Sequence, residues 1–261
     1  MIDQFHALLA VLSGVLVGFT LGLVGGGGSI LAVPLIVYLV GVRSPHVAIG
    51  TSALAVAVNA LIGLFSHARS GNVNWRCGGS YAAAGVIGAL AGSTLGKAMD
   101  GQKLLFLFAL LMIAVSVAMF RGRGDAGVEG VVCNRDNLPK VMSFGFGTGA
   151  LSGFFGIGGG FLIVPGLVAS TSMTIYRAIG TSLIAVAAFG LTTALSYAAS
   201  GLLDWVLAGY FIAGGALGSV IGTRAARLLS ARKGMLNVLF AGMILIVAAY
   251  MMVRSAGAVF G

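Results

Sequence analysis

The sequence predicts an all-α, polytopic membrane protein with two inverted repeats. Each repeat has about five helical segments and a short helix broken by glycine. Composition is the first observation: 59% of the 261 residues are hydrophobic and 8% are charged, whereas soluble domains carry about 25% charged residues. Two further observations, an internal duplication and an uneven distribution of Lys and Arg, predict the repeats and their inversion.

The duplication relates the two halves of the chain. Pro165 lies 131 positions after Pro34, and an offset of 130 holds beyond that point. The matching segments are Ile49-Gly50-Thr51-Ser52 with Ile179-Gly180-Thr181-Ser182, Ser70-Gly71 with Ser200-Gly201, Trp75 with Trp205, and Gly85, Gly88 and Gly92 with Gly215, Gly218 and Gly222. Because this register is kept over most of each half, we predict a first membrane repeat at 1–120, a cytoplasmic linker at 121–138 and a second membrane repeat at 139–261.

Each repeat contains five apolar segments with the length and composition of helices. The expected segments are 5–24, 28–42, 46–66, 76–98 and 103–120, then 139–156, 159–171, 177–198, 205–227 and 233–254. A full crossing needs about 20 residues, so the second segment of each repeat is either a tilted short helix or one arm of a re-entrant hairpin. Either arrangement gives each half an odd number of crossings, which inverts one repeat relative to the other.

The Lys and Arg residues support the inversion. With a cytoplasmic linker, the inverted arrangement places eleven of them inside and four outside, whereas a parallel arrangement divides them eight to seven. The positive-inside rule therefore favours a multi-pass protein of the cell (inner) membrane with both termini outside. The net charge of +9 is interpreted as a topology signal rather than as a nucleic-acid surface, because no basic patch is interleaved with aromatic residues.

The remaining polar residues limit the chemistry. Cys77 and Cys133 lack the spacing of metal ligands and are predicted to be free cytoplasmic thiols; no metal or cofactor is expected. All six acidic residues lie at ends or in loops, which argues against a carboxylate-based cation site. Coupling would then use His46, His67 or protonation of the substrate, although a histidine at a helix edge is usually just solvated. Asn59 either lines a path or bonds to a neighbouring helix.

Two glycine runs form the candidate binding site. Gly25-Gly26-Gly27-Gly28-Ser29 precedes Val33-Pro34, and its copy around Gly156 precedes Val164-Pro165. Each glycine costs about 1 kcal/mol relative to alanine inside a helix, so both runs should break the helix and expose backbone N–H groups at a helix start, where compact anions bind. Broken helices at matching places in two repeats are typical of transporter sites. The candidate residues are Gly25, Gly26, Gly27, Gly28, Ser29, Gly156, Gly158, Gly159 and Gly160.

Two Thr-Ser pairs lie early in the third segment of each repeat. Thr51-Ser52 and Thr181-Ser182 could complete the anion pocket with their hydroxyls, or bond back to their own helices; the sequence favours neither. Gly85, Gly88 and Gly92, with their copies, are assigned to close helix packing.

These motifs resemble the TauE/SafE sulfite exporter family, also called the toluene-sulfonate uptake permease family. The residues that carry the likeness are the two glycine runs with Val33-Pro34 and Val164-Pro165, and Ala48-Ile49-Gly50-Thr51-Ser52 with Ala178-Ile179-Gly180-Thr181-Ser182. The resemblance covers nearly the whole chain in two copies and implies a secondary transporter that exports or imports sulfur-containing anions such as sulfite or organosulfonates, with export as the expected direction. The residues alone indicate only a small anion. Gly27-Gly28-Ser29 stands opposite Gly158-Gly159-Gly160, so the two half-sites need not be equivalent.

The expected mechanism is alternating access around a site near the bilayer midplane. A passive anion channel, or a transporter of another small anion, is the alternative. An enzyme is not expected, because the sequence has no HExxH motif, no paired intramembrane acids and no nucleophile elbow. The expected partners are a small anionic substrate and the lipid bilayer, without nucleic acid; proton coupling and a homo-oligomer are left open.

Overall fold

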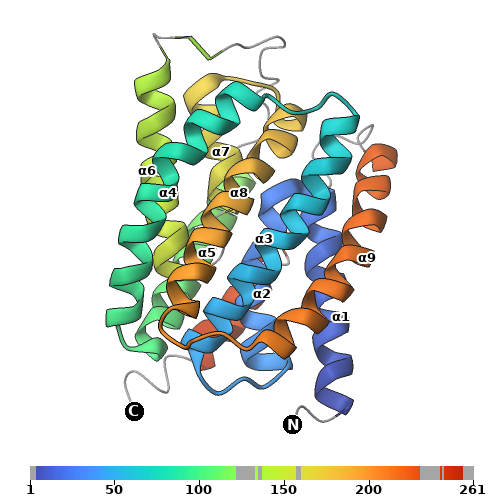
Figure 1. The fold of residues 1–261 in the computed structure, drawn as a ribbon, viewed down its shortest axis with the longest axis vertical. Helices are drawn as coiled ribbons and strands as arrows, with labels where there is room; N and C mark the ends of the chain where they lie inside the picture. The colour runs from blue at the N-terminus through green and yellow to red at the C-terminus, as the bar shows by residue number, and fades with distance from the viewer. Residues whose placement is uncertain are drawn as a thin grey trace.

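The protein folds as a bundle of helices, as the sequence predicts (Figure 1). The structure, a computed structural model, describes residues 4–121, 133–134, 137–156, 160–229, 242 and 244–254. The elements are α1 (Gln4–Val24), η1 (Gly25–Leu31), α2 (Ala32–Pro34), η2 (Leu35–Leu39), α3 (Pro45–Arg69), α4 (Trp75–Ala98), α5 (Gly101–Arg121), α6 (Leu138–Phe155), α7 (Gly160–Thr171), α8 (Ile175–Ala198) and α9 (Trp205–Leu229), followed by the helix Ile244–Arg254.

The second segment of the first half differs most from expectation. The glycine run ends the α-helix: α1 stops at Val24, and the chain folds back on α1 as the 3-10 helix η1. Beyond Pro34, which has no N–H to donate, η2 is a π-helical turn in which Val40 N–H donates to the Leu35 carbonyl over 2.9 Å. The last predicted segment, 233–254, is described as helix only from Ile244 to Arg254.

The two halves run in opposite directions through the bundle (Figure 1). In the first half, α1 starts at the lower end, the short segment η1–η2 returns the chain to that end, and α3, α4 and α5 then run up, down and up. In the second half, α6 starts at the upper end, α7 returns the chain there, and α8 and α9 run down and up. Each short segment therefore forms a hairpin with the helix before it, in agreement with the re-entrant alternative.

The outer surface has the character of a lipid-facing surface. Five helices are long and apolar enough to cross a membrane: Phe5–Leu23, Pro45–Arg69, Gly101–Ala118, Tyr176–Ala198 and Trp205–Ala225. Large apolar side chains such as Leu195 and Leu217 point outward. Trp75 and Trp205, which begin α4 and α9 at opposite ends of the bundle, are both exposed, as is typical of the aromatic belts at the two membrane surfaces.

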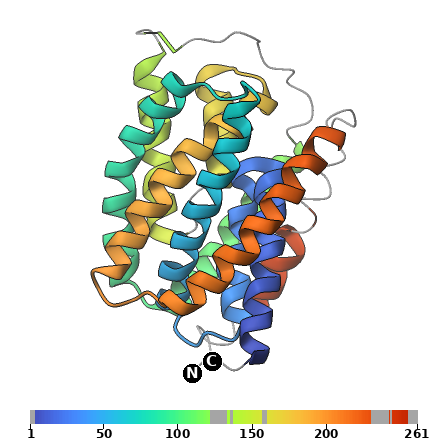
Figure 2. The ribbon, with the colours of Figure 1, turned by 45° about the vertical axis from the view of Figure 1, so that its right-hand side comes forward.

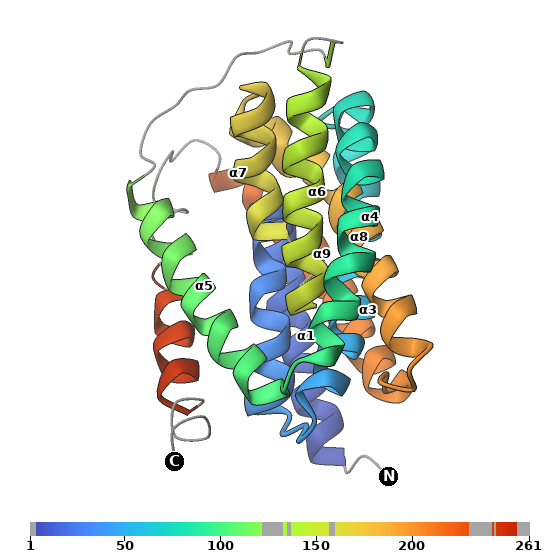
Figure 3. The same cartoon turned by 90° about the vertical axis from the view of Figure 1, so that its left-hand side faces the viewer.

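Backbone-to-backbone packing through glycine joins the two halves. α1 lies along α9, and α6 lies along α4 (Figures 2 and 3). A Cβ atom on Gly18 would overlap the Gly215 carbonyl oxygen, and a Cβ atom on Gly149 would overlap the Gly85 carbonyl oxygen. Gly149 is the copy of Gly18 and Gly215 is the copy of Gly85, so the two interfaces have the same construction with the roles of the two halves exchanged. Gly88, Gly92, Gly218 and Gly222 meet backbone in the same way, which confirms their assignment to packing.

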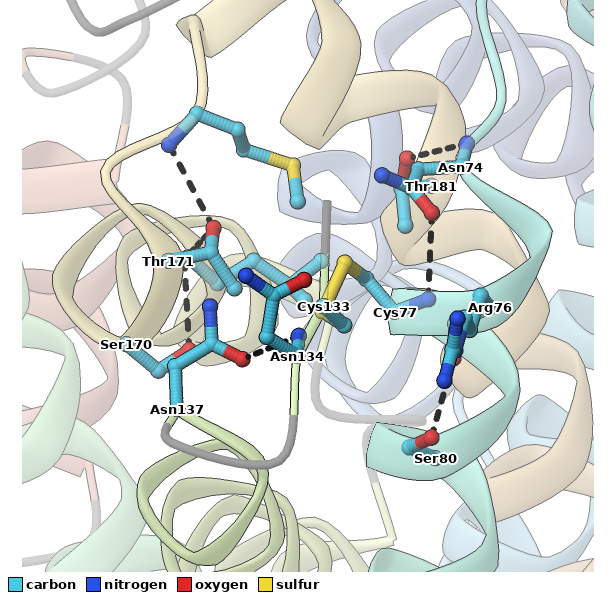
Figure 4. The surroundings of a disulfide bond; sticks show 12 residues. Asn74, Arg76, Cys77, Ser80, Cys133, Asn134, Asn137, Ser170, Thr171 and Thr181 are labelled. Carbon is cyan, nitrogen blue, oxygen red and sulfur yellow. Dashed lines mark hydrogen bonds between the residues drawn. A yellow bond between two sulfur atoms is a disulfide. The ribbon is translucent and has the colours of Figure 1, made fainter. Parts of the chain in front are cut away.

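The prediction of free cysteines is wrong. Cys77, in the first turn of α4, is disulfide-bonded to Cys133, which precedes α6, and their Cα atoms are 5.4 Å apart (Figure 4). Both residues are buried. The Asn134 N–H donates to Asn137 Oδ1 over 2.9 Å in the turn that leads into α6. The pairing depends on Cys133 lying beside the first turn of α4, a tertiary feature that the spacing of two cysteines cannot reveal.

Gly149→Ala should destabilise the protein by about 1–3 kcal/mol, because the added methyl group has no room between α6 and α4. The measurement is the melting temperature of the purified protein in detergent. Gly147→Ala, two residues away on α6, is the matched control: a Cβ atom there meets nothing within 4 Å. Equal melting temperatures for the two variants would contradict this account of the interface.

The disulfide predicts that denatured, non-reduced protein gives no product with a maleimide. The chain has two cysteines, so two thiols should react after reduction, detected as a mass shift of the intact protein. Cys133→Ser should expose the Cys77 thiol without reductant. Labelling of the unreduced wild type at both positions would overturn the disulfide.

Candidate functional site

The two glycine-led segments lie against each other inside the bundle. η1, from the first half, contacts α7, from the second half. Figure 3 shows the start of α7 next to the blue N-terminal segment. Because the two hairpins enter from opposite ends of the bundle, their tips meet in its interior. The structure therefore brings together the two broken segments that the sequence selected.

In the first hairpin, Gly28 is required by close packing. A Cβ atom on Gly28 would overlap the backbone of Thr20 and Leu21, so η1 folds tightly back on α1. Ser29, the next residue, is fully buried. Gly25, Gly26 and Gly27 form the first turn of η1; their surroundings lie outside the described structure.

In the second hairpin, Gly156 turns the chain. It has φ +67°, a left-handed conformation that favours glycine, and its N–H donates to the Ser152 carbonyl to end α6. A Cβ atom here would overlap the side chain of Ile49 on α3. Gly160 is the first residue of α7 and is buried. Gly158 and Gly159 lie outside the described residues.

The four Thr and Ser residues after the short segments are fully buried. Thr51 Oγ1 accepts from the Asp204 N–H, and Thr181 Oγ1 accepts from the Asn74 N–H, both over 3.0 Å. Each threonine thus holds the turn before an outer helix of the other repeat, one at each end of the bundle. The structure does not bring Thr51 and Thr181 together.

The neighbouring serines bond within their own helices. Ser52 donates to the Ile49 carbonyl over 2.9 Å, and Ser182 donates to the Ile179 carbonyl over 2.7 Å. Of the two alternatives for Ser52 and Ser182, a bond to the residue's own helix is therefore the one that the structure shows.

His46 and His67 both lie at an edge of α3, as expected, but His67 is not solvated. His67 is 6% exposed, and its Nδ1 lies 3.1 Å from Asn72 Nδ2. Its ring lies 6.3 Å from the ring of Tyr176, and the ring of His46 lies 6.3 Å from that of Tyr197. These are reciprocal pairs, because Tyr176 and Tyr197 occupy the repeat positions of His46 and His67. Within the described residues, no group of His, Cys, Asp or Glu side chains is arranged to hold a metal ion.

The sequence did not identify a polar cavity between α3 and α9. Its volume is about 190 Å³, and it is lined by Ile62, Gly63, Ser66, Ser219, Val220, Thr223 and Arg224. Asn59, one turn before Gly63 on α3, is fully buried, and neither polar atom of its side chain has a hydrogen-bond partner in the described structure. The expected bond from Asn59 to a neighbouring helix is therefore absent there. In the sequence, the one indication of a polar region here was Asn59, an amide inside the otherwise apolar segment of α3.

Thr51→Val and Thr181→Val should each lower stability by about 1 kcal/mol, because each leaves a backbone N–H at a helix start without its acceptor. The measurement is again the melting temperature. Thr94→Val is the control, since Thr94 is exposed and its hydroxyl donates to the Ala91 carbonyl of its own helix. A loss for the control as large as for Thr51→Val would contradict the role of these hydroxyls.

Comparison with known proteins agrees with this architecture. Residues 10–251 match the model of the family described as "Sulfite exporter TauE/SafE". A "Probable membrane transporter protein" of Xylella fastidiosa (strain Temecula1) is 51% identical over 95% of each chain. The "Probable membrane transporter protein YdhB" of Bacillus subtilis is 28% identical over 85% of this chain and 91% of its own. No solved structure gives a significant match. With a family match over nearly its whole length, this chain belongs to the TauE/SafE sulfite exporter family of membrane transporters.

Proposed function

We propose that the protein is a secondary transporter, an exporter, of small sulfur-containing anions such as sulfite or organosulfonates. The contact between η1 and α7 carries the proposal. This contact brings together one glycine-led segment from each half of the chain. It lies inside a helical bundle whose outer surface is apolar. Such a place is where transporters of this architecture bind substrate. The nature of the anion follows from the family, since backbone donors alone select for negative charge and not for sulfur.

The proposed site consists of both glycine runs: Gly25, Gly26, Gly27, Gly28, Ser29, Gly156, Gly158, Gly159 and Gly160. N–H groups near a helix start, with the positive end of the helix dipole, stabilise an anion. Glycine permits close approach of the ligand, because no Cβ atom covers the backbone. The bonds that Thr51, Thr181, Ser52 and Ser182 make support a positioning role for these residues.

The proposed mechanism is alternating access between inverted repeats, with boundaries at 1–120 and 139–261. Contacts of α1 with α9 repeat as contacts of α6 with α4, and contacts of α3 with α9 repeat as contacts of α8 with α4. A structure whose halves make equivalent contacts can exchange their conformations and arrive at a state of similar energy that opens to the other side.

The proposed orientation places the linker end in the cytoplasm and both termini outside the cell membrane. Described cations gather at the linker end: Arg69, Arg76, Lys140, Arg177 and Arg224. The cations at the opposite end are Arg43, Lys97, Lys103 and Arg254. The disulfide also lies at the linker end and opposes this assignment, since disulfides persist in oxidising compartments. Burial of Cys77 and Cys133 shields the bond, because thiol exchange needs access. A reporter fused to the C-terminus decides the orientation.

Flux into proteoliposomes tests the function. A transporter should take up ³⁵S-labelled isethionate (2-hydroxyethanesulfonate) or sulfite with saturation, and unlabelled anion inside the vesicles should accelerate uptake. The Gly147→Ala variant, altered at an open position of α6, should transport like the wild type. Gly159→Ala should reduce transport by tenfold or more while the yield of folded protein is kept.

Two results would overturn the proposal. Flux that rises linearly with concentration and gains nothing from anion on the far side would indicate a passive channel. Saturable transport of phosphate or chloride with no response to sulfur anions would indicate another substrate class.

A further inference from the structure

We propose that the cavity between α3 and α9 is a second anion site, distinct from the η1–α7 crossing, which receives a small oxoanion at the linker end. Its assignment to sulfonates or sulfite rests on the proposed function, whereas its assignment to anions rests on its own side chains. The cavity lies in the last turns of α3 and α9, near the end of the bundle.

The cavity is formed by one face of each helix. Residues 62, 63 and 66 follow one another at helical spacing on α3, and residues 219, 220, 223 and 224 do so on α9. Gly63 has no side chain to fill the space: Ser219 Oγ lies 3.7 Å from where a Cβ atom of Gly63 would be. The lining is polar on both sides, with Ser66 facing Ser219 and Thr223 across the cavity.

Two side chains at this place lack the partners that buried polar groups normally have. Ser219 is 1% exposed, and its Oγ has no hydrogen-bond partner in the described structure. Asn59 is fully buried one turn deeper against Gly215, again without a partner for its amide. Leaving such groups unsatisfied is costly, so a ligand in the cavity that accepts a hydrogen bond from Ser219, which lines it, gains affinity here.

The charge at the cavity selects an anion rather than a cation. Arg224 lies at the mouth, and no carboxylate is among the lining residues. Hydroxyl groups with a guanidinium are the donors that sulfonate, sulfite and phosphate oxygens prefer. A sodium ion, which the hydroxyl oxygens alone would accept, is repelled by Arg224.

At the equivalent place in the other repeat pair, hydrogen bonds join the two helices. Between α4 and α8, Ser93 Oγ donates to Ser196 Oγ over 3.0 Å. Lys97 Nζ donates to the Ser196 carbonyl and to Ser200 Oγ, each over 3.0 Å.

At the cavity, the counterparts of Ser93 and Ser196 are Thr223 and Ser66, and they are not bonded to each other. The Thr223 hydroxyl donates instead to the Ser219 carbonyl of its own helix over 3.0 Å. The same pair of positions is therefore joined at one end of the bundle and parted at the other. This is the asymmetry expected where an anion enters from one side.

Site-directed alkylation tests the cavity. Both native cysteines are disulfide-bonded, so Ser66→Cys supplies the only reactive thiol for iodoacetamide in the purified full chain. Isethionate should slow its alkylation at least tenfold. Ser70→Cys, just past the end of α3 and exposed, is the matched control and should be unaffected. Added to Ser66→Cys, Ser219→Ala or Arg224→Gln should raise the isethionate concentration needed for protection about tenfold, whereas Arg224→Lys, which keeps the charge, should raise it less.

The outcomes separate the two proposals. Transport of isethionate without protection of Ser66→Cys would overturn the cavity site and leave the proposed function intact. Protection by phosphate but not by sulfonates would support an anion site and contradict the sulfur substrate. Protection that survives both Ser219→Ala and Arg224→Gln would overturn the assigned side chains. Absence of protection by any of isethionate, phosphate and chloride, together with absence of transport, would overturn both.

Discussion

The close approach of backbones at glycine is the constraint on which the rest of the structure depends. Lipid chains are as apolar as leucine, so helices in a bilayer associate through tight packing rather than through the hydrophobic effect. Gly18 against Gly215, and Gly149 against Gly85, bring α1 onto α9 and α6 onto α4 without intervening side chains. Each tight pair takes one helix from each half, so neither half forms its packing surface alone.

Because the two tight helix pairs, α1 with α9 and α6 with α4, each combine both halves, they determine which elements lie between them. α3 and α8 contact each other in the interior (Figure 2), and the two hairpins with their glycine tips pack beside them. The turns before the outer helices are held across the halves by Thr51 and Thr181. The hydroxyl contacts further along these interfaces differ between the two repeat pairs. Ser93 is hydrogen-bonded to Ser196 between α4 and α8, whereas the counterparts Thr223 and Ser66 line a cavity between α9 and α3.

One pair of equivalent buried positions differs in polarity. Phe189 on α8 stacks on Tyr81 of α4, whereas its counterpart on α3, Asn59, has no hydrogen-bond partner in the described structure. An apolar filler and an unsatisfied amide at equivalent places show that the duplication kept the fold while the interiors diverged. A polar group is retained at such a cost where a ligand or an alternative state satisfies it.

The sequence by itself determined the helical class, the duplication, the bounds of the long helices from α1 to α9 to within about a turn and the glycine runs as the special segments, because apolar run length, residue spacing and helix propensity are local properties. Only the tertiary structure decided the Cys77–Cys133 bond, the burial of His67 and the cavity beside Ser219. Each of these depends on which surfaces meet across a long stretch of chain. It also decided that Thr51 and Thr181 lie at opposite ends, since identical motifs in two halves of opposite direction are separated by the inversion itself.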